Sequence, residues 1–200
     1  MKVLANDGLS QEGIDVIKNA GIEIDTNNIP QEELAVKLND YDAIIVRSAT
    51  TVRKDLIDAT NLKAIGRAGV GMDNIDVDYA RSKGIAVINT PGASSISVAE
   101  LVFAHLFSLC RYTHRSTTAM QNGEWPKKDY TGIELTGKTI GLVGYGNIAK
   151  EVARRAIGLG MNVCSYSISE IHPKQKVSVC NSLDEMLAKS DFVAILLVIS

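Results

Sequence analysis

The sequence has few cysteines, few aromatic residues and no excess of charge of one sign. Its 200 residues include 3 Cys and 5% aromatic residues, and the formal net charge is −2. Because the Lys and Arg residues are dispersed, there is no basic patch for a nucleic acid or a membrane surface. The three cysteines have no metal-like spacing and indicate reduced thiols in or near the core of a cytoplasmic protein.

Histidine clusters and long apolar runs are also missing. His105, His114 and His172 form no cluster with cysteine, so we expect no metal site. The apolar run at the N-terminus is too short for a signal peptide. A long stretch without Pro or Gly over residues 96–122 contains several charged residues and is not expected to cross a membrane.

Short apolar runs alternate with helical segments along the whole chain. Non-alternating runs are typical of strands buried on both faces, and they occur at residues 3–5, 43–46, 64–66 and 86–88. Helical segments are predicted between them, at residues 11–20, 31–38, 54–59 and 77–83. After a loop at 122–129, further strands are predicted at 139–143, 162–166, 177–179 and 192–199, and helices at 147–159 and 183–189. This alternation predicts an α/β fold with parallel sheets.

A long helix is predicted between the two alternating units. The sequence from Ser97 to Glu100 has the pattern of a capping box, which places the start of the helix there. The residues that follow are apolar on nearly all sides, as in a helix buried within a domain or at a subunit interface. We therefore expect His105 to be a hydrogen-bonded core residue, and residues 97–120 to form a homodimer contact.

Two apolar runs end in glycine clusters, at residues 66–71 and 141–146. A dinucleotide loop needs glycines for a tight turn and close approach to the pyrophosphate, followed at once by a helix whose N-terminal amides hold the phosphates. Gly144, Gly146 and Ala149 satisfy this pattern, and an amphipathic helix follows directly. The first cluster does not, because acidic residues follow it and no helix is expected before about residue 76. The sequence therefore predicts the dinucleotide loop at Gly144.

The strand after this loop lacks the expected acidic residue at its end. Such an acid accepts hydrogen bonds from the adenosine ribose, but here the strand ends at Tyr166 and Ser167 follows. Glu170 comes too late in the chain. Ser167 would tolerate the 2′-phosphate of NADP, yet no Arg stands beside it, so the interpretation favours NAD over NADP.

Arg47 and Ser48 follow one predicted strand, and Gly69 to Gly71 follow the next. Ligands of open parallel sheets collect beyond the carboxyl ends of the strands. An Arg side chain and bare glycine amides there would suit an anion. The alternative is a surface Arg beside an ordinary turn, and the residues alone leave both possibilities open.

At these motifs the chain resembles the D-2-hydroxyacid dehydrogenases, most closely the 3-phosphoglycerate dehydrogenases. The matching stretches occur in order and cover essentially the whole chain, at residues 46–50, 66–76, 84–91, 97–100, 122–125, 132–135 and 137–146. The resemblance implies a flavodoxin-like substrate domain over residues 1–96. It also implies the N-terminal portion of an NAD-binding Rossmann domain over residues 97–200.

The family also implies roles for particular residues. Arg47 and Ser48 resemble the substrate-anion loop, and Ser94 is a weaker candidate. The positions that resemble cofactor contacts are Val70 at the nicotinamide end, Gly144, Gly146, Asn147 and Ile148 at the pyrophosphate, and Ser167 at the ribose. The family usually has Arg or a similar side chain where Asn147 stands.

The chain departs from the family pattern in three places. Ser167 replaces the usual Asp. Leu196 and Val198 replace a His-x-Pro motif. The family's catalytic Arg, acid and His lie beyond residue 200, so no catalytic residue is expected within the chain, and segment 192–199 is expected to lack neighbouring strands.

The expected activity is NAD-dependent oxidation of a D-2-hydroxy acid. By the resemblance, the substrate is 3-phosphoglycerate, the product is 3-phosphohydroxypyruvate, and the reaction serves serine biosynthesis. The chain would then be part of a longer enzyme and inactive alone. Two alternatives stay open, namely a non-catalytic NAD-responsive regulatory module and a degenerate remnant that binds no cofactor.

Overall fold

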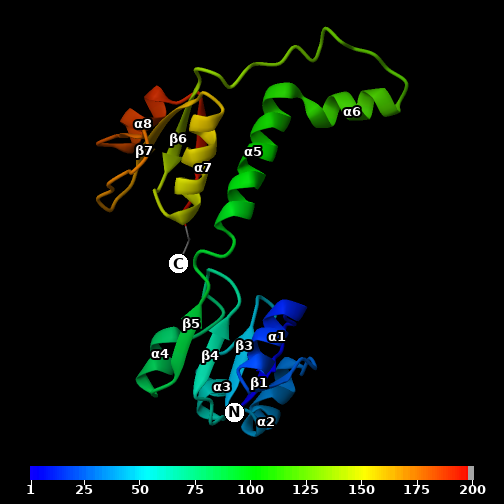
Figure 1. Ribbon diagram of the computed structural model, residues 1–200, viewed down its shortest axis with the longest axis vertical. Coiled ribbons are helices and arrows are strands. Elements are labelled where there is room, and N and C mark those ends of the chain that lie inside the picture. Colours follow the sequence, from blue (N-terminus) through cyan, green and yellow to red (C-terminus); the bar gives the residue numbers. More distant parts are fainter. Residues whose placement is uncertain (198–200) are drawn as a thin grey trace. The chain divides into compact units, whose positions relative to one another are not determined.

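The computed structural model describes residues 1–197 and shows an α/β protein with two parallel sheets. The chain divides into two compact units, Met1–Ala93 and a second unit that begins at Ser94. Each unit contains one sheet (Figure 1). The predicted fold class is confirmed.

The first unit contains a five-stranded sheet with the order β2-β1-β3-β4-β5, in which every pair is parallel. This is the strand order of flavodoxin-like folds. The strands are β1 (Lys2–Ala5), β2 (Glu23–Asp25), β3 (Ala43–Val46), β4 (Ala64–Arg67) and β5 (Ala86–Asn89). The helical segments are α1 (Gln11–Asn19), η1 (Gln31–Glu33), α2 (Leu34–Lys37), η2 (Leu38–Asp40), α3 (Lys54–Asp58) and α4 (Val77–Ser82).

The core of the first unit explains why the short apolar runs are strands. Leu4, Ile44, Val46 and Ile65 from the three central strands are fully buried in one apolar cluster. The carboxyl ends of β1, β3, β4 and β5 lie at the same edge of the sheet because all of these strands are parallel. The loops that leave this edge are therefore neighbours.

The second unit has a four-stranded parallel sheet with the order β8-β7-β6-β9. Its strands are β6 (Thr139–Val143), β7 (Asn162–Tyr166), β8 (Ser178–Val179) and β9 (Phe192–Ile195). Its helices are α5 (Ser95–Arg111), α6 (Thr113–Gln121), α7 (Asn147–Gly158) and α8 (Leu183–Lys189).

The last strand differs from the sequence expectation. Segment 192–199 was expected to lack neighbours, but β9 pairs in parallel with β6, and Phe192 is in register with Ile140. The strand ends at Ile195, and Leu196 still donates its N–H to Val143 O at 3.1 Å. Val198, one of the two departures from the family motif, lies outside the described residues.

Helix α5 begins earlier and is more exposed than the sequence predicts. Its first residue is Ser95, so the capping box expected at Ser97 is wrong, and residue 97 lies inside the helix. His105 is exposed, which contradicts its expected place in the core. The helix ends at Arg111, and the left-handed backbone of the next residue, Tyr112 (φ 52°), separates α5 from α6 without Gly or Pro.

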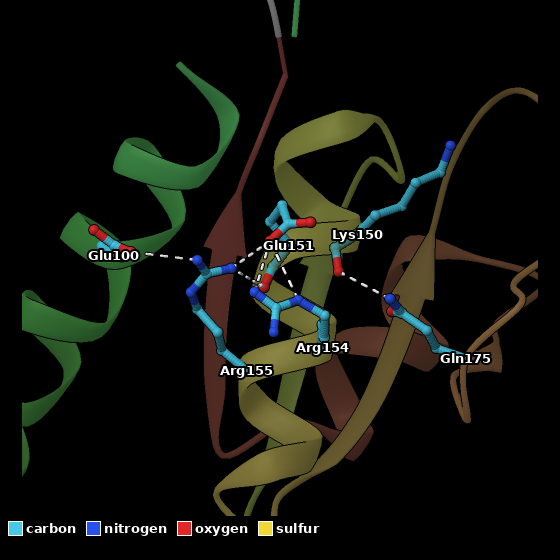
Figure 2. A network of polar contacts seen from close by, with 6 residues as sticks. All are labelled: Glu100, Lys150, Glu151, Arg154, Arg155 and Gln175. Atoms are coloured by element: carbon cyan, nitrogen blue, oxygen red, sulfur yellow. Dashed lines mark hydrogen bonds and ion pairs between the residues drawn. The ribbon is translucent and has the colours of Figure 1, made fainter. Parts of the chain in front are cut away.

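An ion-pair network connects α5 to α7 within the second unit (Figure 2). Arg155 of α7 donates to Glu151 one turn earlier and to Glu100 Oε1 of α5 at 3.3 Å. Arg154 also donates to Glu151, at 3.1 Å. Hydrogen bonds from both Arg side chains lower the pKa of Glu151, with the bond from Arg155 contributing most. The network supports the packing of α5 beside the helix that follows the glycine loop.

The cysteines agree with the expectation from sequence. Cys110, Cys164 and Cys180 are free and buried. Within residues 1–197 no group of His, Cys, Asp and Glu side chains is placed to hold a metal ion. Over the same residues, no helix has both the length and the apolarity to cross a membrane.

Candidate functional site

In the second unit, the candidate dinucleotide loop connects β6 to α7. Gly144 has a positive φ of 88°, which L-residues with side chains rarely adopt. Its N–H donates to Tyr166 O at 2.7 Å, so the turn is attached to the end of β7. A Cβ at this position would lie 2.8 Å from Leu197 Cδ2, so both the backbone angle and the space favour glycine.

Gly146 is the N-cap residue of α7, and the helix begins at Asn147. The first intrahelical bond runs from Lys150 N–H to Gly146 O at 3.1 Å, so the N–H groups of the preceding helical residues point out of the first turn. Gly146 is exposed, and a Cβ built on it would meet no atom within 4 Å. A helix N-terminus with free amides and an open backbone beside it fits a phosphate group.

Further small or polar residues complete this edge of the second sheet. Ala149 is fully buried, which permits close packing of α7 on the sheet. Ser165 is also fully buried and donates to Leu142 O at 3.0 Å, whereas Ser167 comes just after β7 and is half-buried. The end of β7 therefore presents a hydroxyl where a ribose-binding carboxylate was expected.

Sequence reasoning missed Tyr145 and Gln175 near this loop. Tyr145 is 8% exposed, and burial raises the pKa of its hydroxyl. That hydroxyl lies 3.4 Å from Gln175 Oε1, and Gln175 Nε2 donates to Lys150 O at 3.3 Å. Figure 2 shows Gln175 reaching α7 from the segment after β7. No pattern in the sequence marks Gln175, because it lies in an irregular segment.

In the first unit, Arg47 and Ser48 follow β3 directly, and both are exposed. The backbone of this loop is held by side chains from elsewhere. Arg47 N–H donates to Asp7 Oδ2 at 2.6 Å, and Asn74 Nδ2 donates to Arg47 O at 2.8 Å. Neither Asp7 nor Asn74 was identified from the sequence as a site residue.

Val70 lies in the loop after β4, beside the loop after β5. Asn89 Nδ2 donates to Val70 O at 2.7 Å, and Thr90 N–H donates to Gly69 O at 3.0 Å. The loop after β4 also joins the one after β3, through a parallel bridge between Val52 and Ile75. The structure therefore brings Arg47, Ser48 and Val70 to one edge of the first sheet.

Arg67, at the end of β4, is a second cation at this edge. Its Nη2 lies 3.4 Å from Ser48 Oγ, and its Nη1 donates to Ala68 O at 2.9 Å. Its Nε is buried and has no hydrogen-bond partner among residues 1–197. The glycine cluster at residues 66–71 marks this loop in the sequence, but it does not predict that Arg67 reaches Ser48.

Ser94, the weaker substrate candidate, comes directly before α5 and is the first residue of the second unit. Its carbonyl accepts from Val98 N–H at 3.0 Å, and its side chain makes no capping hydrogen bond. The site residues thus form two groups, one at the carboxyl edge of each sheet, with Ser94 at the start of α5.

The charge of Asp7 is the main electrostatic feature of the first group. Burial favours a higher pKa for this carboxyl. Hydrogen bonds from the Thr50 hydroxyl and from the backbone N–H groups of Thr50, Arg47 and Ala49 outweigh that effect and lower the pKa. Asp7 is therefore ionised at neutral pH, and its negative charge is matched by donors of the loop that carries Arg47.

The comparisons with known proteins agree with this arrangement. The family model "D-isomer specific 2-hydroxyacid dehydrogenase, catalytic domain" matches residues 3–156. The chain is 40% identical over 200 residues to D-3-phosphoglycerate dehydrogenase of Methanocaldococcus jannaschii, and 41% identical over 196 residues to hydroxypyruvate reductase of Thermotoga maritima. These matches cover 98% and 97% of this chain.

A solved structure, an acyclic imino acid reductase in complex with NADPH and D-Arg, superposes with a TM-score of 0.86 at 28% identity. That match covers 98% of this chain and 65% of the other. The chain belongs to the D-isomer specific 2-hydroxyacid dehydrogenases. It spans 38% of the length of the first relative named above and 64% of the second.

Proposed function

We propose that the protein is an NAD-dependent oxidoreductase that acts on the CH–OH group of a D-2-hydroxy acid, with 3-phosphoglycerate as the substrate and 3-phosphohydroxypyruvate as the product. The observation that carries the proposal is the pair of anion-type sites at the carboxyl edges of the two sheets. One is the glycine loop at the N-terminus of α7, and the other is the Arg47–Ser48 loop after β3. The 40% identity to a D-3-phosphoglycerate dehydrogenase supports the choice of substrate.

The proposed cofactor site is the edge of the second sheet. Amides at the start of α7, from Asn147 and Ile148, would hold the pyrophosphate, while Gly144 and Gly146 keep the backbone accessible. Ser167 would contact the adenosine ribose. Val70, which lies in the first unit, is proposed for the nicotinamide end from the family resemblance alone. When bound, the nicotinamide supplies or accepts the hydride at the 2-carbon of the substrate.

The proposed substrate site is the edge of the first sheet. The Arg47 guanidinium can pair with a carboxylate or phosphate through two parallel hydrogen bonds, and the Ser48 hydroxyl adds a donor beside it. Ser94 is the third proposed contact. His105, His114 and His172 are all exposed and lie outside these loops, so we assign none of them to proton transfer.

The choice between NAD and NADP depends on Ser167. A relative with this fold is described in complex with NADPH, but we propose NAD because no Arg in the sequence adjoins Ser167 to attract a 2′-phosphate. The Ser167→Asp variant should bind NADH with unchanged or higher affinity and should bind NADPH at least tenfold more weakly, because the new carboxylate repels the phosphate. An unchanged affinity ratio in fluorescence titrations would show that residue 167 does not approach the ribose.

We also propose that the natural protein forms a homodimer through α5. Leu101 and Leu109 on this helix are 55% and 72% exposed, and Ile96 is 53% exposed. Large apolar side chains exposed on one helix are typical of a subunit contact. Sedimentation should show a dimer at micromolar concentration, and the double variant Leu101→Glu, Leu109→Glu should be monomeric.

The test of function is reduction of 3-phosphohydroxypyruvate and of hydroxypyruvate with NADH, followed at the nicotinamide absorbance. It should be run on residues 1–200 and, where the natural product is longer, on the full-length product as well. We expect activity of the full-length protein with the phosphorylated substrate, and at least a tenfold higher KM for Arg47→Met. Preference for hydroxypyruvate would contradict the substrate assignment. NADH binding without turnover by the full-length protein would favour a regulatory module instead.

A further inference from the structure

The loop from Arg47 to Thr50 is held at both ends by two polar side chains from distant parts of the chain. Asp7 follows β1, and Asn74 lies in the loop after β4. Both contact the backbone of the same two residues, Arg47 and Thr50. Asp7 accepts from their N–H groups, and Asn74 donates to their carbonyl groups.

Asp7 binds the N–H groups of the loop. Its Oδ2 accepts from Arg47 N–H at 2.6 Å and from Thr50 N–H at 3.1 Å. Its Oδ1 accepts from the Thr50 hydroxyl. That hydroxyl in turn accepts from Asn6 Nδ2 at 2.9 Å, and Thr50 is only 4% exposed. The carboxylate therefore fixes both ends of a turn that would otherwise move relative to the sheet.

Asn74 binds the carbonyl groups of the same residues. Its Nδ2 donates to Arg47 O at 2.8 Å and to Thr50 O at 2.7 Å. Asn74 is 7% exposed, and its Oδ1 is buried without a hydrogen-bond partner among residues 1–197. Leaving a buried acceptor unpaired in this way destabilises the folded state. Both amide hydrogens nevertheless serve the loop, which indicates that the position is specialised for holding it.

These hydrogen bonds involve the loop backbone and the Thr50 hydroxyl, not the side chains in the middle of the loop. Ser48 and Ala49 are exposed, and the Arg47 side chain is exposed as well. Among residues 1–197, the Ser48 hydroxyl has one hydrogen bond, which it accepts from Arg67 Nη2 at 3.4 Å. The loop is thus rigid at its ends and open in between, which is the arrangement that reduces the ordering cost of binding a ligand.

We propose that Asp7 and Asn74 are positioning residues, which fix the backbone of the Arg47–Thr50 loop and thereby set the affinity of Arg47 and Ser48 for the anionic substrate. The proposal rests on the proposed function of this loop. Asp7 places a negative charge near a site for an anion, which by itself weakens binding. Its hydrogen bonds from the loop offset this repulsion by holding the donors in a binding geometry.

The test uses Asp7→Asn and Asn74→Ala in the full-length protein. Each variant should raise KM for 3-phosphohydroxypyruvate about tenfold, equivalent to 1.4 kcal/mol, and change kcat less than about threefold. The loop contributes equally to binding of the substrate and the transition state, which explains this split. The dissociation constant for NADH, measured by fluorescence, should be unchanged.

Asp42→Asn is the matched control. Asp42 precedes β3 at the opposite edge of the same sheet, and it also accepts a backbone N–H, from Lys2 at 2.8 Å. This variant should leave KM unchanged although it loses a comparable hydrogen bond. An equal rise in KM for Asp42→Asn would show that general destabilisation of the unit is sufficient, and it would overturn the proposal.

Arg47→Met separates this proposal from the proposed function. If KM is unchanged in Arg47→Met, the loop does not bind the substrate and the function assigned to it is wrong. If Arg47→Met raises KM while well-folded Asp7→Asn and Asn74→Ala do not, the positioning role alone is wrong. Should those two variants fail to fold, Thr50→Val decides. It removes only the hydroxyl that joins Asn6 to Asp7, and it should raise KM about threefold, whereas an unchanged KM would overturn the proposal.

Discussion

The two glycine clusters have similar sequences but different structures. In the second unit, residues 144–146 form a tight turn from β6 directly into the twelve-residue helix α7. In the first unit, residues 69–71 follow β4 without a helix, and the next helix, α4, begins only at Val77. The loop after β4 instead forms backbone and side-chain hydrogen bonds with the neighbouring loops after β3 and β5.

The difference lies in what each glycine makes possible. Gly144 supplies a backbone angle that other residues rarely adopt, with φ 88°. Gly69 has no such angle, but a Cβ there would overlap the Arg67 guanidinium. In the 144–146 loop, glycine permits the turn that starts a helix able to hold phosphates. In the 69–71 loop, the missing side chain of Gly69 leaves room for the Arg67 guanidinium to pack against the backbone. A glycine-rich motif has a function only together with the element that follows it.

The largest effect is expected for Gly144→Ala. The positive φ costs a side-chain-bearing residue about 1–2 kcal/mol, and the new Cβ would also displace Leu197. We expect the free energy of unfolding to fall by about 2 kcal/mol and NADH binding to be lost at accessible concentrations. Denaturant unfolding and fluorescence titration measure the two effects. Native-like values for both would show that the turn is not under the constraint described here.

Gly146→Ala should separate binding from stability. Gly146 has φ −81°, and a Cβ there meets no atom within 4 Å, so the free energy of unfolding should change by less than about 0.5 kcal/mol. NADH affinity should nevertheless fall about tenfold, because the methyl group would occupy the space through which the backbone approaches the pyrophosphate. Unchanged affinity would place the dinucleotide elsewhere and weaken the contrast between the two loops.

Gly69→Ala should have a smaller effect, confined to the first unit. The Arg67 guanidinium can swing away from the new methyl group, at the cost of its bond to Ala68 O. We expect a loss of stability of about 1 kcal/mol, comparable to one hydrogen bond, and a few-fold rise in KM for the oxo acid. NADH affinity measured as above should be unchanged. Loss of NADH binding as severe as in Gly146→Ala would mean that both loops hold the dinucleotide.

The sequence predicted the strands of both sheets where apolar residues are consecutive. It missed β2 (Glu23–Asp25), a short edge strand with a single apolar residue, because its pairing with β1 depends on backbone groups. It also placed the start of α5 at Ser97. The helix begins at Ser95 instead, which shows that a capping pattern alone does not fix where a helix starts. Tyr112 ends α5 in a left-handed conformation that no local Gly or Pro announces.

The sequence predicted the exposed loop residues of the candidate site, but it did not predict the residues that hold those loops in place. Arg47 and Gly144 follow strands in the sequence, and parallel strands bring such positions to one edge of each sheet. Asp7 and Asn74 are separated by more than 60 positions and share no motif. Only the fold brings both of them to one four-residue loop. Long-range polar contacts of this kind leave no periodic signal for sequence reasoning to use.

The smallest expected effect is the dependence of stability on acidic pH, which should differ between the two loops because, in the described part of the chain, only one of them binds a carboxylate. Within residues 1–197, the hydrogen bonds of 144–146 involve no carboxylate, whereas the Arg47 loop depends on ionised Asp7. Hydrogen bonds lower the pKa of Asp7 in the folded protein below its ordinary value of about 3.9. The stability that Asp7 contributes is therefore complete above that value and is lost as the pH falls through the lower pKa of the folded state.

Asp7→Asn should consequently be less stable than the wild-type protein at neutral pH, and the difference should shrink as the pH falls below about 4. Denaturant unfolding at a series of pH values measures it, with Asp42→Asn as the comparison, because hydrogen bonds from Lys63 and Lys2 also lower the pKa of Asp42. KM for the oxo acid then separates the two carboxylates. Both variants should show the acid-dependent difference in stability, but only Asp7→Asn should raise KM, because only Asp7 contacts the loop that carries Arg47.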